Sequence, residues 1–276
     1  MSPRWLVLPA VVALTSGSLL MAAGGGANAA PATHHRTTIV RPGGNVKGFV
    51  PGGLIKRPHG AQVRRHGRVY QEQSSNWSGY AASGGSGSYN SVSASWTQPT
   101  ATCNDSGDEY AAFWVGLDGF NSNSVEQTGT DSDCSGGSPD YYGWYEMYPA
   151  APVYFTDPVQ PGDSMSASVT FSGSDTYTLV LTDNTEGWNE TETIQESGLA
   201  NSSAEVITEA PSSEFGPLPL ADFGTVNFSG STANGGSMDA QNPTQIIMVG
   251  SSGDQLDTTS PMDGAGDFSN TWEAQS

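Results

Sequence analysis

The chain has 276 residues, a formal net charge of −19 and 36% hydrophobic residues, which is enough apolar material for one core. All nine Lys and Arg and all four His precede position 69, whereas all 28 Asp and Glu follow it. Residues 69–276 therefore exclude a Ser-His-Asp triad, a Cys-His pair, a Ser-Lys dyad and a Schiff-base lysine, because each needs a nitrogen base. They also offer no histidine for zinc and no cationic surface for nucleic acid, so we expect neither partner.

The first residues have the pattern of a secretory signal. Arg4 precedes a mostly apolar run that ends in Ala27-Asn28-Ala29, a small-x-small pattern that signal peptidase cuts. A membrane anchor is the alternative, but polar residues at 15–18 interrupt the run, and a spanning helix needs about 20 apolar residues. We therefore expect residues 1–29 to be a signal peptide, and the mature protein to be secreted, extracellular and free of the membrane.

Residues 30–72 form a basic segment. They hold eight of the nine Lys and Arg and a single acid, Glu72, and their Gly and Pro residues break any periodicity. A solvated basic linker is the alternative. Tethering this segment to a strongly acidic domain gives it a high effective concentration and favours electrostatic binding. We expect residues 30–72 to be a propeptide that acts as an intramolecular inhibitor and separates when acid protonates the carboxylates.

Residues 73–276 show a period of two throughout. Apolar and hydroxyl side chains alternate at 92–96, 165–171 and 177–181, and Gly- and Ser-rich turns separate such runs. No amphipathic helix of useful length is apparent. Short strands at this spacing predict one antiparallel β-sandwich or barrel, and periodicity does not choose between the two.

Two cysteines, Cys103 and Cys134, fit export to an oxidising compartment. We expect them to form a disulfide, whose loop closure contributes about 3 to 4 kcal/mol on the chain-entropy model. Two thiols alone are a poor metal site.

Several stretches are richer in aromatic and polar residues than a core strand requires. They are residues 76–80, 113–119, 125–131 and 144–149. Aromatic rings interleaved with carboxylates on a sheet indicate a substrate groove, and a sandwich core with polar outer faces is the alternative.

These motifs, with two more, resemble a known family. Asn76-Trp77-Ser78-Gly79, residues 113–119, Glu126-Gln127-Thr128-Gly129, residues 144–149, residues 203–207 and residues 221–226 occur in the order seen in the glutamic peptidases, or eqolisins. The resemblance covers nearly all of the chain beyond residue 73. It implies a secreted acid endopeptidase, made as a precursor, with a concanavalin-like fold of two packed antiparallel sheets and a Gln/Glu pair that works at low pH.

Carried over to this sequence, the resemblance assigns catalysis to Gln127 and Glu205. Glu209 is the alternative glutamate, because residues 205 and 209 share one face of a strand. Glu126 is expected on the opposite face from Gln127, as a structural residue. Tyr142 stands where relatives often have Asp. The resemblance assigns substrate binding to five further residues: Trp77, Trp114, Asp118, Glu146 and Tyr148.

The chemistry of the pair follows from the side chains. An ionised Glu205 can take the proton of a water molecule and return it to the leaving amine, while the Gln127 amide donates to the oxyanion. We expect protein or peptide substrates, no cofactor and a monomer. A carbohydrate-binding or glycoside-hydrolysing concanavalin-like module is the alternative, because two carboxylates beside Trp side chains also suit sugar hydrolysis. Acidic loops around Asp105 and Asp131 lack an EF-hand spacing, which argues against a calcium site.

Overall fold

The computed structural model describes residues 53–61, 63–66, 69–103 and 107–275. The predicted signal peptide and residues 30–52 of the predicted propeptide lie outside the described residues. Within the described ranges, none of the helices has the length and apolarity needed to cross a membrane.

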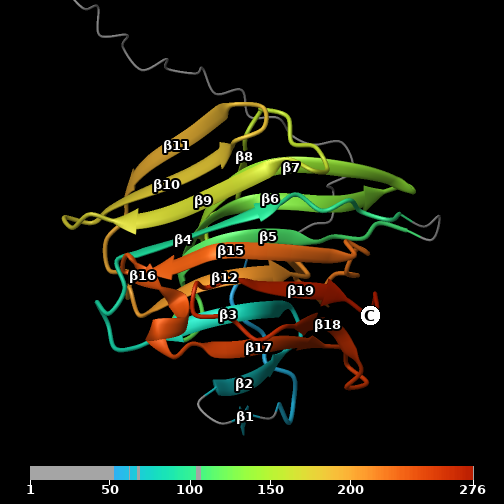
Figure 1. The fold of residues 1–276 in the computed structure, drawn as a ribbon, viewed down its shortest axis with the longest axis horizontal. Coiled ribbons are helices and arrows are strands. Elements are labelled where there is room, and N and C mark those ends of the chain that lie inside the picture. The colour runs from blue at the N-terminus through green and yellow to red at the C-terminus, as the bar shows by residue number, and fades with distance from the viewer. Residues whose placement is uncertain (1–52, 62, 67–68, 104–106, 276) are drawn as a thin grey trace, which may run out of the picture. The chain divides into compact units, whose positions relative to one another are not determined.

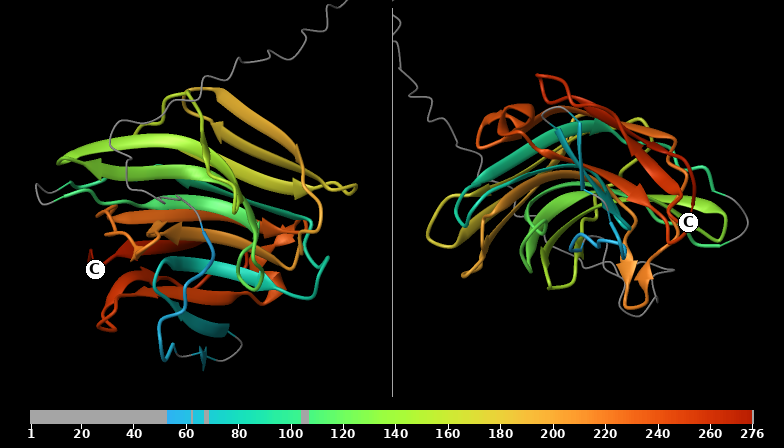
Figure 2. Two further views of the ribbon diagram at one scale, coloured as in Figure 1. Left: turned by 180° about the vertical axis from the view of Figure 1, so that it is seen from behind. Right: turned by 90° about the horizontal axis from the view of Figure 1, so that it is seen from below.

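Strands make up two packed layers, which can be followed in Figures 1 and 2. In spatial order, the first layer consists of β1 (Val63–His66), β2 (Val69–Ser74), β17 (Thr244–Val249), β3 (Trp77–Ser83), β12 (Ser203–Glu209), β5 (Ala112–Asp118), β6 (Val125–Ser135), β7 (Ser138–Tyr148) and β8 (Val153–Tyr154). The second layer consists of β11 (Trp188–Gln195), β10 (Thr176–Asp183), β9 (Ser164–Phe171), β4 (Ser91–Thr97), β15 (Thr225–Ala233), β19 (Phe268–Trp272) and β18 (Gln255–Thr259).

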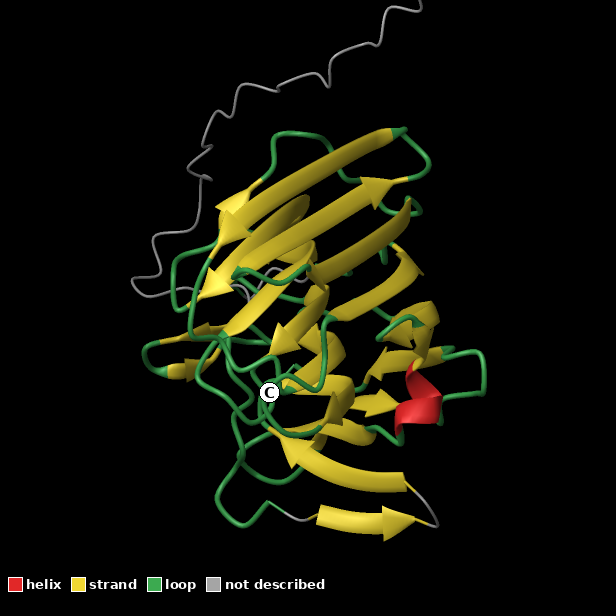
Figure 3. Cartoon of the chain, turned by 90° about the vertical axis from the view of Figure 1, so that its left-hand side faces the viewer, coloured by secondary structure: helices red, strands yellow, loops and turns green. Residues whose placement is uncertain are grey.

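Strand β17 also pairs with β18 and so connects the two layers. All of these strand pairs are antiparallel except β2 with β17. The remaining elements are short: β13 (Ser212–Ser213), β14 (Gly216–Pro217), β16 (Gly236–Ser237) and the 3-10 helix η1 (Met238–Gln241), drawn red in Figure 3. This architecture confirms the predicted all-β sandwich of two antiparallel sheets.

The main core lies between the layers, and alternation explains how the strands fill it. In β10, Tyr177, Leu179 and Leu181 are buried, while the Thr and Val residues between them are only half-buried. Strand β5 differs because all seven of its residues are buried. Its Phe113 joins the main core, and its Trp114 belongs to a second apolar cluster on the other face of the same sheet. A strand covered on both faces reads as a continuous apolar run rather than an alternation.

This second apolar cluster, which we call the outer cluster, positions the candidate site. It contains Ile55, Trp77, Ala81, Ala112, Trp114, Phe120, Val125, Tyr142, Trp144, Ile207 and Ile246, with Tyr148 and Tyr154 packed against it.

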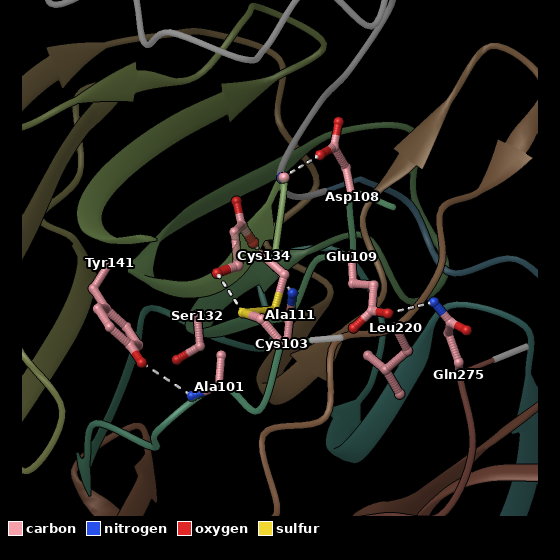
Figure 4. The surroundings of a disulfide bond; sticks show 12 residues. Ala101, Cys103, Asp108, Glu109, Ala111, Ser132, Cys134, Tyr141, Leu220 and Gln275 are labelled. Carbon is pink, nitrogen blue, oxygen red and sulfur yellow. Dashed lines mark hydrogen bonds between the residues drawn. A yellow bond between two sulfur atoms is a disulfide. The ribbon is translucent and has the colours of Figure 1, made fainter. Parts of the chain in front are cut away.

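The predicted disulfide joins Cys103 and Cys134, which are 31 positions apart in sequence and whose Cα atoms lie 5.4 Å apart (Figure 4). Beside it, the backbone of Glu109 exchanges two hydrogen bonds with that of Cys134, at 2.8 and 3.1 Å. The Glu109 carboxylate also accepts a bond of 2.6 Å from Gln275, as Figure 4 shows. The disulfide therefore joins the end of β6 to the segment before β5, and the hydrogen bonds of Glu109 connect this region to Gln275.

The predicted boundary between residues 72 and 73 falls inside a strand. β2 (Val69–Ser74) continues across it and pairs with β17 along five residues. Residues 69–72 of the predicted propeptide are therefore part of the first layer.

Candidate active site

The candidate site lies on the face of the first layer that carries the outer cluster. Strand register places Glu205 of β12, Gly116 of β5, Gln127 of β6 and Glu146 of β7 in one row across the sheet. Residues directly opposite on neighbouring strands point to the same face. A Cβ on Gly116 would lie 2.9 Å from the Trp114 ring and 3.2 Å from Gln127 Cβ, so only glycine leaves room for these side chains.

Gln127 is buried and oriented by the neighbouring strand. Its Nε2 donates to Glu146 Oε2 at 2.7 Å, and its Oε1 has no hydrogen-bond partner. A carboxamide nitrogen carries two hydrogens, so the bond to Glu146 uses one and leaves the other to donate. Gln127 and Glu146, which the family resemblance assigns to catalysis and substrate binding, are thus hydrogen-bonded to each other.

Glu209 is also buried, two residues beyond Ile207 on the same face of β12. Its Oε1 accepts from Asn76 Nδ2 at 3.1 Å, and its Oε2 accepts from Trp114 Nε1 at 3.0 Å. Burial raises the pKa of Glu209 well above its ordinary value, repulsion by Glu146 raises it further, and the bonds from Trp114 and Asn76 oppose the shift. Glu209 therefore interacts with the same Glu146 that holds Gln127.

Glu205 has different surroundings. Burial raises the pKa of Glu205 well above its ordinary value, and the charges of Asp118 and Glu126 add to the shift. The Ser203 hydroxyl and the backbone at Phe120 oppose it, but neither makes a well-aligned hydrogen bond with the carboxylate. Glu205 thus lies in the same row as Gln127, but the charges that act on it are those of Asp118, at the end of β5, and Glu126, near the start of β6.

The remaining predicted residues take several positions. Trp77 and Trp114 are buried in an edge-to-face pair with ring centroids 5.0 Å apart. Tyr148 is half-buried and lines a cavity together with residues 53–56 and the β13–β14 hairpin. The Asp118 carboxylate accepts from the backbone amides of Asn201 and Ser202 at 2.7 and 2.8 Å, so it holds the segment that leads into β12.

Strand register also determines where the side chains of Glu126 and Tyr142 lie. Glu126 is opposite Leu117 and Met147, whose side chains belong to or pack on the main core, so it points away from the face of Gln127. Tyr142 donates its hydroxyl hydrogen to Asp133, a buried partner on the adjacent strand.

A segment of the predicted propeptide covers this site. Ile55 is 8% exposed and belongs to the outer cluster, and a Cβ placed on Gly53 would lie 4.0 Å from Glu209 Oε1. Burial lowers the pKa of Lys56, and attraction to Glu209 opposes that shift. The charge pattern favours binding of the basic segment to the acidic domain, but it does not indicate which face is covered, because residues 53–57 carry no strand or helix pattern of their own.

The next residues fasten the segment. Arg57 forms an ion pair with Glu72, donates to the Phe120 carbonyl at 3.1 Å and lies over the Phe120 ring, 5.0 Å from its centroid. Within the described part of the chain, no group of three His, Cys, Asp or Glu side chains is arranged to hold a metal ion.

The face therefore offers a hydrogen-bonded carboxamide, two buried carboxyls with raised pKa and a row of aromatic rings, with an extended piece of polypeptide lying on it. Carboxyls with raised pKa can accept and donate protons, and a carboxamide can donate a hydrogen bond to an oxygen on which negative charge develops.

Comparison with known proteins agrees with this arrangement. The sequence pattern of the peptidase A4 family matches residues 75–272. Aspergillopepsin-2 of Aspergillus niger is 29% identical in an alignment 222 positions long, which covers 72% of this chain and 78% of that protein.

Solved structures give the same fold. Scytalido-glutamic peptidase, crystallised with a transition-state analogue inhibitor, aligns with a TM-score of 0.61 at 24% identity over 72% of this chain and 98% of its own. Aspergilloglutamic peptidase from Aspergillus niger aligns with a TM-score of 0.53 at 30% identity over 60% of this chain and 99% of its own. Because the family pattern spans well over half of the sequence, the chain belongs to the peptidase A4 family, the eqolisins, and is a glutamic peptidase that hydrolyses peptide bonds.

Proposed function

We propose that the chain is the precursor of a secreted acid endopeptidase in which Gln127 and one glutamate of β12 hydrolyse peptide bonds on the outer-cluster face. The observation that carries the proposal is the hydrogen bond from Gln127 to Glu146, an acid whose charge repels Glu209, beneath a segment of polypeptide. Residues 1–29 act as the signal peptide, and the processed enzyme works as a monomer without a cofactor.

Each catalytic group has a defined task. The ionised glutamate takes a proton from water as the water oxygen attacks the carbonyl carbon, and it then gives that proton to the leaving amine nitrogen. The free amide hydrogen of Gln127 donates to the oxyanion. Removing such a donor costs about 3 to 4 kcal/mol of transition-state stabilisation, or roughly a hundredfold to a thousandfold in rate. A neutral donor suits an acid enzyme, because its role does not change with pH.

Of the two glutamates on β12, the surroundings support Glu209 in place of Glu205, the residue predicted from the sequence. Trp114 and Asn76 donate hydrogen bonds to the Glu209 carboxylate, and the charge of Glu146 adds to the rise in its pKa. Glu209 is also the glutamate that residues 53–56 cover. Glu205 interacts with Asp118 and Glu126, which lie toward the main core and the segment before β12.

The same segment explains inhibition in the precursor. With residues 53–57 in place, Glu209 is buried, and its raised pKa disfavours the charged form that could act as a base. Loss of the segment restores water to the carboxylate, which lowers its pKa toward the ordinary range. Acid weakens the attachment, because a domain whose carboxylates are protonated attracts the basic segment less.

The test is cleavage of a protein substrate at about pH 3.5 by the acid-treated full chain and its variants. Gln127→Ala and Glu209→Gln should each lose at least a hundredfold in rate, whereas Glu205→Gln and the exposed control Glu196→Gln should retain cleavage. If Glu205→Gln is inactive and Glu209→Gln is active, Glu205 is the base. If purified wild type leaves protein uncut at every pH, the proposal fails.

A further inference from the structure

Asn76 lies at the corner between β2 and β3, and its buried carboxamide uses all of its hydrogen-bonding capacity. Nδ2 donates to the Leu54 carbonyl at 3.2 Å and to Glu209 Oε1 at 3.1 Å. Oδ1 accepts from the Lys56 amide at 2.7 Å and from Ser74 Oγ at 3.0 Å. Two donor and two acceptor positions are the full complement of an asparagine side chain.

The two bonds to the covering segment involve only its backbone. Leu54 and Lys56 are two residues apart, so in an extended chain their carbonyl and amide groups point to the same edge. The backbone amide of Ser75 donates to the Lys56 carbonyl on that edge, at 2.8 Å. Because none of these bonds uses a side chain of the segment, any extended polypeptide in this place could form them.

The remaining bond of Asn76 reaches the proposed base. The hydrogen bond to Glu209 favours the charged form of that carboxyl and is one of the interactions that oppose its raised pKa. One side chain therefore contacts both the backbone of a bound chain and Glu209.

We propose that Asn76 binds the backbone of the extended peptide substrate where residues 54–56 now lie, and that it positions Glu209 with its second amide hydrogen. This inference rests on the proposed function. When the segment leaves, one donor and one acceptor of a buried carboxamide lose their partners, and a substrate backbone restores both. The substrate residue between the two bonded groups takes the place of Ile55 in the outer cluster, so apolar side chains are preferred there.

The probe is a synthetic peptide with the sequence of residues 53–58, tested as an inhibitor of the processed enzyme. N-methylation of its Lys56 amide removes the donor to Asn76 and should raise the inhibition constant about tenfold. N-methylation of the Ile55 amide, on the opposite edge, is the matched control and should change the constant less than about twofold. Against the Asn76→Ala enzyme, methylation of the peptide's Lys56 amide should no longer change the inhibition constant, because the Oδ1 acceptor is absent.

A second readout separates positioning from folding. Loss of the Asn76 donor should move the acidic limb of the kcat/KM profile to higher pH, because the charged form of Glu209 loses a hydrogen bond. A smaller folded fraction would lower the rate at every pH without moving this limb. Asn189→Ala, at an exposed position on β11, should leave the profile unchanged. Where Asn76→Ala does not fold, Asn76→Asp retains the acceptor and should keep the effect of the Lys56 methyl group.

Two results would overturn the inference: equal inhibition by the parent and Lys56-methylated peptides, or the same tenfold difference in Asn76→Ala. If wild type cleaves no peptide, the proposed function fails, and calorimetric binding of the same peptides still tests the role of Asn76. Weaker binding of the Lys56-methylated peptide in that assay would support a role of Asn76 in binding peptide backbone without catalysis.

Discussion

Glu126 provides a quantitative test of how buried acids set the pH range of the fold. It points into the main core from β6, and burial, reinforced by the charge of Asp118, raises its pKa from 4.5 to about 9. The folded state therefore binds this proton more tightly than the unfolded state. The stability that the proton contributes is fully present below the unfolded pKa and is lost as pH rises toward about 9.

The magnitude follows from the shift. Each pH unit above the unfolded pKa costs about 1.4 kcal/mol, so the free energy of unfolding should fall by about 3 kcal/mol between pH 4.5 and pH 7 because of Glu126 alone. Glu126→Gln has nearly the same shape and does not titrate. Urea unfolding at pH 4.5, 5.5 and 7 should show a fall that is smaller by about 3 kcal/mol in the variant than in wild type. Parallel curves for wild type and Glu126→Gln would refute this reasoning, whereas the exposed control Glu186→Gln should follow wild type.

Three further changes test the fold and the site. Replacing Cys103 and Cys134 by Ser should lower the free energy of unfolding by about 3 to 4 kcal/mol in urea titrations, because the cross-link between residues 31 apart no longer restricts the unfolded chain; an unchanged midpoint would contradict this. Gly116→Ala should lower the urea midpoint and reduce kcat, since the new methyl group meets Trp114 and Gln127, whereas Gly85→Ala, in open space, should do neither. Ile55→Asp should make the precursor cleave substrate sooner after acidification, because it removes an apolar anchor from the outer cluster, and unaltered activation kinetics would show that Ile55 does not hold the segment.

The sequence predicted those parts of the fold that depend on residues close together in the chain or on the two cysteines. The alternation in β9 and β10 matches the buried and half-buried positions of those strands, and the two cysteines form the expected disulfide. The choice of a sandwich came from the family resemblance, because period two alone is equally compatible with a barrel.

The site was harder to predict because it depends on register and on contacts distant in sequence. Gln127 and Glu146 meet because β6 and β7 pair in one register, and a slip of one residue would separate them. Sequence position cannot distinguish Glu205 from Glu209, since both lie on the same face of β12. The difference arises from Trp114 and Glu146 on other strands and from Asn76 between β2 and β3. The contact between Asn76 and Lys56 spans 20 residues and joins a strand corner to a segment without periodicity.

The central claim is that Gln127 and Glu209 act as one catalytic unit, and a double-mutant cycle measures it most directly. Initial rates of peptide cleavage at about pH 3.5 are compared for wild type, Gln127→Ala, Glu209→Gln and the double variant. Groups that act together lose their effect together, so the double variant should be about as slow as the slower single variant. Cleavage at the wild-type rate in either single variant, or losses that multiply in the double variant, would contradict the account.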